Sequence, residues 1–452
     1  MPDTARNLDL AHSAVARLLK AGADAADVIA AAGTSLSVSY RMGKLEDVER
    51  SEGTDLGLRA LIRGGNGAMR QAVVSITDTA PDALDEAVER VIAMARLAPD
   101  DPFCGLADPA RLAAAIADLD LDDGKAPDAE TLGRRAEAAE RAALDVAGVT
   151  NSMGAGAGWG RASVALVTSD GFEGAYTGGS HSISCSVLAG EGTGMERDYD
   201  FSSARHLADL DAAQAVGRSA GERAVRRLDP RKVKSQAVPI VYDPRVSGGI
   251  VGHLAGAVSG TAVARRTSFL KDRLGERILA RGLTVRDDPL MRRGRASKPF
   301  DAEGVATTML AVVEDGVLAS WILDTSSARQ LGLATTGHAA RSPGSVPHPG
   351  SSNLYLDAGT VDPAALIADI RQGLYETELI GMGVNSVTGD YSRGAAGYWI
   401  ENGEIAFPVT EITVAGNLKD MFLAMTPAND LSFRYATNAP TLRIEGMTIA
   451  GA

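Results

Sequence analysis

The chain has 452 residues, of which 45% are hydrophobic and only 4% aromatic, and it carries 50 glycines and a formal net charge of −13. This length allows two or three domains that each bury their own core, and the glycine content favours close backbone packing over an aromatic-rich ligand pocket. The acidic balance argues against a protein that binds nucleic acid, because phosphate backbones select for excess lysine and arginine.

The charge is distributed unevenly along the chain. Residues 223–298 hold 18 basic and 6 acidic side chains, a local charge of +12, whereas residues 1–125 hold 13 basic and 21 acidic side chains, a local charge of −8. The basic segment either forms ordinary solvated helix faces or docks an acidic partner or peptide, because such a field steers association. Arg265 and Arg266 are the candidates for the second role.

Cysteine use and hydropathy favour a cytoplasmic protein. The two cysteines, Cys104 and Cys185, cannot support a disulfide framework and suit a reducing compartment. The first ten residues lack the basic-then-apolar pattern of a signal peptide. Residues 246–264 carry no charged side chain, but they are too rich in small and hydroxyl residues to span a membrane. We therefore expect no membrane contact.

Residues 1–97 are predicted to form an N-terminal α/β domain. Apolar residues at helical spacing predict a helix over 5–20, and a second helix begins near Pro81. Between them, three short segments separated by glycine alternate apolar with polar residues and predict a meandering sheet with one solvated face: SLSVSYRMG, KLEDVERSE and TDLGLRALI, within residues 35–62.

Residues 98–127 are predicted to be a solvated acidic linker. Aspartates alternate from Asp118 to Asp122 as in a calcium loop. However, Asp123 stands where such a loop needs glycine, and Ala129 stands where it needs a bidentate glutamate. A calcium site is therefore not expected.

Residues 128–230 are predicted to form a middle α/β domain. It opens with a helix near 128–147, and Asp170–Gly171 predicts a hairpin because this pair tolerates the positive φ angles of a tight turn. The GRSAG segment around Ser219 matches the nucleophile elbow of serine hydrolases, but that elbow joins a strand to a helix. Ser219 lies in a continuous helical pattern and is expected to be inert.

Residues 235–452 are predicted to form a large β-rich C-terminal domain that contains a glycine-striped helix. Asp243 and Pro244 are the N-cap and first-turn signals of this helix. Glycines recur every fourth residue and share one face: Gly248, Gly252, Gly256 and Gly260. Each costs roughly 1 kcal/mol against alanine in a helix, so they predict a very close contact, in the core or with another backbone or peptide. Val251, Leu254 and Val258 are spaced to face the core.

The rest of this domain is predicted to be strands, turns and loops. Two pairs predict further hairpins, Asp315–Gly316 and Asn402–Gly403. Residues 335–353 form a long loop rich in glycine, proline and serine, as lids and binding loops often are. In residues 389–399, glycine accompanies Asp390 and Arg393, which favours either a loop that binds a peptide backbone or a structural turn.

His253 lies beside the glycine stripe and is a candidate zinc ligand. A helical zinc site needs a second ligand one turn away and commonly a glutamate beside the first histidine. Here Leu254 follows His253, Ala257 lies one turn on, and the cysteines are far upstream. We therefore expect a packed or hydrogen-bonded histidine, with a metal ligand as the less favoured alternative.

Four segments of the chain resemble the TldD/PmbA metallopeptidase family and, within it, the PmbA branch, also called TldE. They are GHLAGAVSGTAVARRTSFLKDRLGERI, SKPFDAEGV, ARQLGLATTGHA and GVNSVTGDYSRGAAGYWIENGEIAFPVTEITVAGNLKDM. The resemblance is clearest from about residue 236 to the C-terminus. It implies an α+β fold with an N-terminal α/β domain, a middle α/β domain and a large β-rich C-terminal domain.

The resemblance also implies a cytoplasmic TldD–TldE pair that acts on unfolded peptides. In TldD-type chains the helix equivalent to 246–260 carries His-Glu-x-x-x-His, with a downstream cysteine as a further ligand. This chain departs from that motif at every ligand position other than that of His253. We therefore expect no catalytic residue, metal ligand or cofactor here, and zinc in a TldD-type partner. The candidate substrate or interface residues are Gly252, His253, Gly256, Gly260, Arg265, Arg266, Asp390 and Arg393.

Two alternatives stay open. The chain could be a peptidase that is active alone or as a homodimer, with a metal held by His253 and by ligands from loops or a second copy, but no general base is placed for this. It could also be a non-catalytic homodimeric scaffold that binds peptides. A neighbouring coding region for a His-Glu-x-x-x-His homologue would favour the two-chain peptidase.

Overall fold

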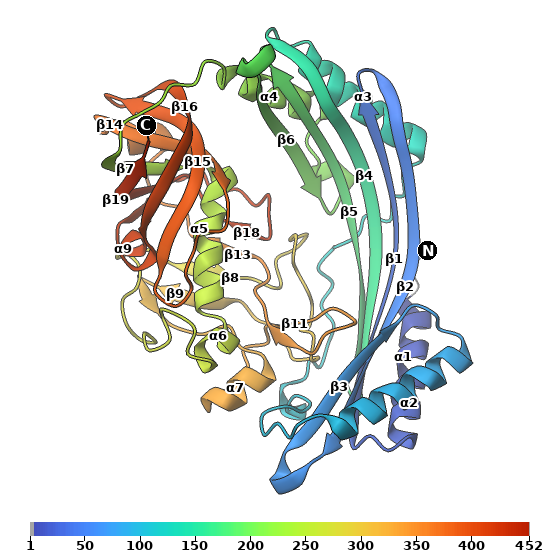
Figure 1. Cartoon of the computed structure of the whole chain (residues 1–452). Helices are drawn as coiled ribbons and strands as arrows, with labels where there is room; N and C mark the ends of the chain where they lie inside the picture. Colours follow the sequence, from blue (N-terminus) through green and yellow to red (C-terminus); the bar gives the residue numbers. More distant parts are fainter. Residues whose placement is uncertain (1–3, 452) are drawn as a thin grey trace.

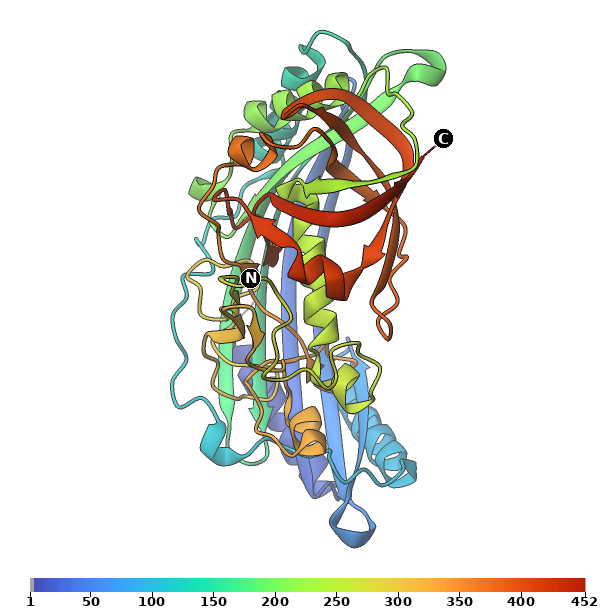
Figure 2. The ribbon, with the colours of Figure 1, turned by 90° about the vertical axis from the view of Figure 1, so that its left-hand side faces the viewer.

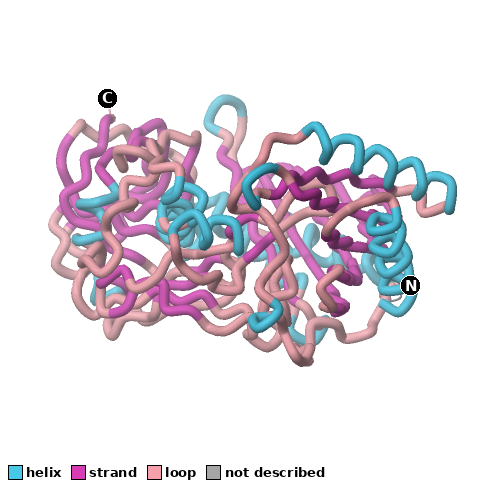
Figure 3. The backbone as a smooth tube through the Cα atoms, turned by 90° about the horizontal axis from the view of Figure 1, so that it is seen from below, coloured by secondary structure: helices cyan, strands magenta, loops and turns pink. Residues whose placement is uncertain are grey.

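The computed structural model describes residues 4–451, which form a long curved sheet and a β-rich body that faces it (Figures 1 and 2). Seen from below, the two lie side by side (Figure 3). Helices and strands are mixed and most strand pairs are antiparallel, which confirms the predicted α+β class. No helix within residues 4–451 is both long and apolar enough to span a membrane.

The curved sheet has six antiparallel strands in the order β3-β2-β1-β4-β5-β6. Their bounds are β1 Ala25–Arg41, β2 Lys44–Arg63, β3 Met69–Ile76, β4 Val149–Thr168, β5 Glu173–Ala189 and β6 Glu196–Ala204. β1 pairs with β2 on one side and with β4 on the other, from Asp27 opposite Thr168 to Tyr40 opposite Ala155. The segments predicted as N-terminal and middle domains therefore share one continuous sheet.

The three segments predicted as strands between residues 35 and 62 do lie in strands, but their division into three short strands is wrong. β1 and β2 are long strands joined by a turn at Met42 and Gly43, whose φ angles are 51° and 72°. Gly53, which was expected to separate two strands, lies inside the ladder opposite Gly33. Glycine adopts extended as well as left-handed angles, so its presence alone did not distinguish a turn from a strand position.

Four helices cover one face of the curved sheet in two pairs (Figure 1). Their bounds are α1 Thr4–Lys20, α2 Pro81–Leu97, α3 Ala129–Leu144 and α4 Ala213–Arg226. Val28 and Ala30 of β1 pack under α1 and α2, whereas Val38 of the same strand packs under α3 and α4. Ser219 lies inside α4, so no strand-to-helix elbow surrounds it, as predicted.

Residues 98–127, predicted to be a solvated acidic linker, are exposed over 114–118 but docked on the protein over 119–123. Leu119 and Leu121 are buried, and the carbonyl of Leu121 accepts a backbone hydrogen bond from β5. An Asp123 carboxylate oxygen lies 3.2 Å from Nε2 of the buried His181. Because leucine alternates with aspartate here, the apolar side chains bury while the acids meet donors. A count of charges does not reveal this arrangement.

The β-rich body is built around a second six-stranded sheet, in the order β16-β15-β14-β7-β19-β17. An additional pairing of β16 with β19 closes five of these strands into a ring. A five-stranded sheet, β10-β9-β8-β13-β18, and the pair β11-β12 complete the strands of this body. The strand bounds are β7 Gln236–Tyr242, β8 Val285–Asp287, β9 Leu310–Glu314, β10 Val317–Leu318, β11 Ala339–Ala340, β12 His348–Pro349, β13 Leu354–Leu356, β14 Gln372–Ile380, β15 Asp390–Glu401, β16 Glu404–Asn417, β17 Met425–Pro427, β18 Thr437–Asn438 and β19 Leu442–Ala450. The shorter helices are η1 Gly65–Gly67, η2 Pro109–Arg111, η3 Gly192–Gly194, η4 Leu207–Asp209, α7 Thr325–Leu331, α8 Pro363–Ile367 and α9 Leu418–Leu423.

α5, Pro244–Ala257, packs against these sheets and begins where the sequence predicts. An Asp243 carboxylate oxygen accepts a hydrogen bond from the backbone N–H of Arg245 at 2.9 Å. The predicted core-facing residues are buried: Val251, Leu254 and Val258. Gly260 begins a separate short helix, α6 Gly260–Ala264, so the prediction that all four glycines share one helix is wrong.

The three predicted hairpins are confirmed. Asp170–Gly171 joins β4 to β5, Asp315–Gly316 joins β9 to β10, and Asn402–Gly403 joins β15 to β16. At the last two turns, the aspartate and the asparagine have φ angles of 47° and 50°, as tight turns of this kind require.

A buried ion cluster joins the curved sheet to the β-rich body. Arg59 of β2 donates to Asp27 of β1, with Nε and Oδ2 2.7 Å apart, and Arg341 pairs with the other oxygen of Asp27. All three side chains are almost inaccessible to solvent. Arg341 comes from the 335–353 segment, which the sequence suggested as a lid. Part of that segment is instead paired as β11 and β12, and it anchors the joint.

Candidate functional site

α5 presents an exposed strip of glycine backbone. Gly249, Gly252 and Gly256 are exposed, and a Cβ atom built at any of them would meet no neighbouring heavy atom within 4 Å. Their spacing places them on one side of the helix. The predicted tight contact at Gly252 and Gly256 is therefore wrong within this chain, and the strip is free to meet a partner or a peptide.

The other two glycines of the predicted stripe do make close contacts. A Cβ atom at Gly248 would lie 2.8 Å from the carbonyl oxygen of Thr437, and one at Gly260 would lie 2.4 Å from Oγ of Ser327. Both positions therefore need glycine for packing within the chain. Sequence spacing could not distinguish the crowded glycines from the exposed ones, because the residues that crowd Gly248 and Gly260 come from segments far along the chain.

His253 lies on the same side of α5 and is half-buried. Its ring packs edge-on against Tyr391 of β15, with the ring centroids 5.9 Å apart and an interplanar angle of 75°. Burial, together with the positive charge of Arg393, lowers the pKa of His253 and favours the neutral imidazole. The structure thus places His253 as a packed histidine, in agreement with the favoured prediction.

The residues around His253 do not fit a zinc site of the His-Glu-x-x-x-His type. If His253 occupies the place of the second histidine, Gly248 and Gly249 stand at the first histidine and the glutamate. The Thr437 carbonyl leaves no room for a side chain at Gly248. Within the described residues, no group of three or more histidine, cysteine, aspartate or glutamate side chains is placed to hold a metal.

Three other predicted site residues lie apart from this strip. Arg265 and Arg266 are exposed after α6, and Arg266 pairs with Asp272 at 3.2 Å. Asp390 accepts hydrogen bonds from Thr388 and Asn417 at 2.6 and 3.0 Å, so its carboxylate holds the turn before β15. This contact fits the structural-turn alternative for residues 389–399. Only Arg393, from the same segment, joins the site described next.

A cavity of about 370 Å³ lies where the N-terminal part of α5 meets the curved sheet. Its walls come from β6, the residue that follows α4, α5, β14 and β15. The charged lining residues are Arg197, Asp198, Arg227, Arg245, Glu378 and Arg393. Gly249, the first residue of the exposed glycine strip, also lines it.

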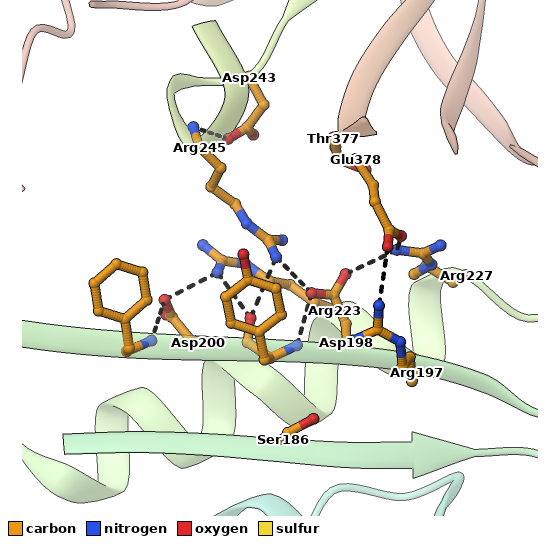
Figure 4. Close-up of polar contacts among 12 residues, drawn as sticks. Ser186, Arg197, Asp198, Asp200, Arg223, Arg227, Asp243, Arg245, Thr377 and Glu378 are labelled. Atoms are coloured by element: carbon orange, nitrogen blue, oxygen red, sulfur yellow. Dashed lines mark hydrogen bonds and ion pairs between the residues drawn. The ribbon is translucent and has the colours of Figure 1, made fainter. Parts of the chain in front are cut away.

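Ion pairs organise most of this cavity and connect the two bodies (Figure 4). Arg245 at the start of α5 donates to Asp198 of β6 at 2.7 Å, and its guanidinium lies 4.7 Å from the Tyr199 ring centroid. Glu378 of β14 lies 2.6 Å from Arg227 and 3.2 Å from Arg197. The two cavity carboxylates are therefore already paired with arginines.

Arg393 differs from the other cavity arginines. It forms no ion pair within the described residues, and its buried Nε atom has no hydrogen-bond partner there. Nearby Glu376 is fully buried, and neither of its carboxylate oxygens has a hydrogen-bond partner among the described residues. Burial raises the pKa of Glu376 well above its ordinary value, whereas the positive charge of Arg393 opposes this shift. The cavity lining itself has four arginines and two carboxylates.

Sequence reasoning found only Arg393 among the charged residues of this cavity. The others were missed: Arg197, Asp198, Arg227, Arg245 and Glu378. They come from separate elements, so no spacing pattern connects them. The one available signal was the excess of arginine after residue 222, which includes Arg227 and Arg245 but does not single them out.

The chain is similar to known proteins over almost its whole length. Models of the PmbA/TldA metallopeptidase match residues 26–95 as domain 1, 120–228 as the central domain and 235–451 as the C-terminal domain. The central match begins inside the predicted linker. Metalloprotease PmbA of Escherichia coli O157:H7 is 37% identical over 446 residues, covering 98% of this chain and 96% of the relative. Its homologue in Haemophilus influenzae is 34% identical over 441 residues, covering 97% and 94%.

Solved structures share the fold. A Bacteroides thetaiotaomicron protein, named as a proposed modulator of DNA gyrase, superposes with a TM-score of 0.90 at 28% identity and 99% coverage of both chains. TldE of Thermococcus kodakarensis gives a TM-score of 0.85 at 20% identity, covering 97% of this chain and 99% of the other. With the curated relatives, these likenesses establish that the chain belongs to the PmbA/TldD metallopeptidase family, in its PmbA (TldE) branch.

Proposed function

We propose that this chain is the zinc-free subunit of a two-chain metallopeptidase, in which a TldD-type partner supplies the zinc and the general base. The observation that carries the proposal is the pair Gly248 and Gly249, which stand where the zinc motif needs a histidine and a glutamate when His253 is aligned with the second histidine. A catalytic zinc site needs three protein ligands and an open position for water. Here His253 is the single candidate ligand on α5, and Gly248 has no space for another side chain.

In this proposal the chain holds the unfolded peptide substrate while the partner cuts it. The exposed strip of Gly249, Gly252 and Gly256 supports this role, because an extended backbone can approach a helix surface closely only where side chains are absent. The exposed Arg265 and Arg266 remain candidates for docking an acidic surface of the partner. The two cysteines are free and buried, which suits the proposed cytoplasmic location.

A reconstitution assay tests the proposal. The purified chain, a purified TldD-type chain and their mixture are each given an unstructured peptide, and cleavage is followed by mass spectrometry. We expect cleavage by the mixture at a rate far above that of either chain. His253→Ala in this chain should reduce the rate far less than loss of either motif histidine in the partner. Chelator-sensitive cleavage by this chain alone, at the rate of the mixture, would contradict the proposal and favour an enzyme active by itself.

A further inference from the structure

We propose that the arginine-lined cavity beside α5 binds a carboxylate group of the peptide substrate. The inference rests on the proposed function and adds the chemical group that this chain recognises. The carboxylate belongs either to the C-terminus of the peptide or to an aspartate or glutamate side chain within it.

The charge of the cavity selects an anion. Its lining has four arginines and two carboxylates, and both carboxylates are already engaged: Asp198 by Arg245, and Glu378 by Arg197 and Arg227. Nearby Glu376 forms no hydrogen bond with the remaining arginine, because neither of its carboxylate oxygens has a hydrogen-bond partner within the described residues. A ligand with one negative charge would therefore reduce an existing imbalance.

Arg393 is the cavity arginine that forms no ion pair within the described residues. Its buried Nε atom lacks an acceptor within the described residues, and an unpaired buried donor costs free energy that a ligand oxygen would recover. A guanidinium matches the two oxygens of a carboxylate with parallel hydrogen bonds. Arg197, which is half-exposed at the cavity, can add a second contact to such a ligand.

The space and the approach also fit a peptide. The cavity holds about 370 Å³, many times the roughly 30 Å³ share of one water molecule. Gly249 lines it, and Gly252 and Gly256 continue from Gly249 along the same side of α5. A chain whose carboxylate lies in the cavity can therefore run along a helix surface that has no obstructing side chains.

The test is peptide binding by the full chain, followed by fluorescence anisotropy with an uncharged fluorophore. Three versions of one short unstructured peptide are compared: a free C-terminus, a C-terminal amide, and the amide with one internal glutamate. We expect the free acid to bind about tenfold more tightly than the plain amide. If the internal glutamate restores the affinity, the cavity accepts a side-chain carboxylate as well as a C-terminal one; if it does not, the cavity requires the C-terminal carboxylate. Either result supports the site.

Matched variants assign the effect to Arg393. Arg393→Gln should abolish the advantage of the carboxylate peptides, whereas Arg218→Gln removes the same charge from the exposed face of α4 and should not change it. If Arg393→Gln does not fold, Arg197→Gln replaces it, because that side chain is half-exposed. The site is overturned if neither carboxylate peptide binds more tightly than the plain amide, if Arg393→Gln behaves like Arg218→Gln, or if neither this chain nor its two-chain complex binds any of the peptides. Peptide cleavage by this chain without a partner would instead overturn the proposed function. Failure of the carboxylate site and failure of the proposed function are therefore distinguishable.

Discussion

Asp27 and Glu303 are both buried, but their surroundings move their pKa values in opposite directions. Burial alone would raise the pKa of Asp27, yet Arg341 and Arg59 outweigh it and the pKa is lowered. For Glu303, the negative charge of Asp301 adds to burial and raises the pKa to about 8. Glu303 is therefore protonated at neutral pH. One of its carboxyl oxygens accepts a hydrogen bond from the backbone N–H of Thr325.

Glu303→Gln should change how stability depends on pH. Between about pH 4.5 and pH 8 the folded chain holds a proton on Glu303 that the unfolded chain releases. The contribution of Glu303 to the stability of the wild type therefore falls as pH rises through this range. The neutral amide removes that loss. The difference in melting temperature between the variant and the wild type should therefore favour the variant more at pH 8.5 than at pH 5. Calorimetry at the two pH values measures this difference. Glu404→Gln, on an exposed side chain, is the control, and an equal shift for both variants would contradict the argument.

At the scale of elements, local signals predicted caps and turns but not the pairing of distant strands. Asp243 caps α5, and the aspartate–glycine and asparagine–glycine pairs form hairpins, because each depends on two to four neighbouring residues. The ladder between β1 and β4 joins residues more than 100 positions apart, and no local pattern specifies it. The continuous sheet was missed for this reason, as were the two different environments of the glycines on α5.

Alanine at two glycines of α5 should have opposite effects on stability. Gly248→Ala places a methyl group 2.8 Å from the Thr437 carbonyl, so we expect a loss of about 1–3 kcal/mol. Gly252→Ala enters open space on a helix and should stabilise the isolated chain by roughly 0.5–1 kcal/mol. Chemical denaturation of the two variants measures this difference. A shift of the same sign for both would show that the exposed strip is packed in solution, for example in a homodimer.

At the scale of the whole molecule, the candidate site exists because two bodies meet. Arg245 on α5 reaches Asp198 on the curved sheet at one end, and Arg341 reaches Asp27 at the other. The family resemblance predicted the architecture. It did not predict the cavity, whose lining comes from β6, α5, β14, β15 and the residue after α4 and forms only when these contacts form.

Asp27→Asn tests the joint between the two bodies. It would leave Arg59 and Arg341 buried without a counter-charge, which typically costs about 3–5 kcal/mol. We expect a clear fall in melting temperature by differential scanning calorimetry. Asp272→Asn, which removes the exposed partner of Arg266, should cost less than about 1 kcal/mol. Equal effects of the two variants would mean that the buried cluster does not hold the bodies together.

The most direct test of the central claim is the zinc content of the purified chain, by itself and in complex with a TldD-type chain. Elemental analysis after gel filtration should find no stoichiometric zinc in this chain and one zinc in the two-chain complex. The complex should keep its zinc with His253→Ala in this chain and lose it when the motif histidines of the partner are replaced, because those side chains are the proposed ligands. One zinc bound per chain in the absence of the partner, together with chelator-sensitive peptide cleavage, would contradict the account.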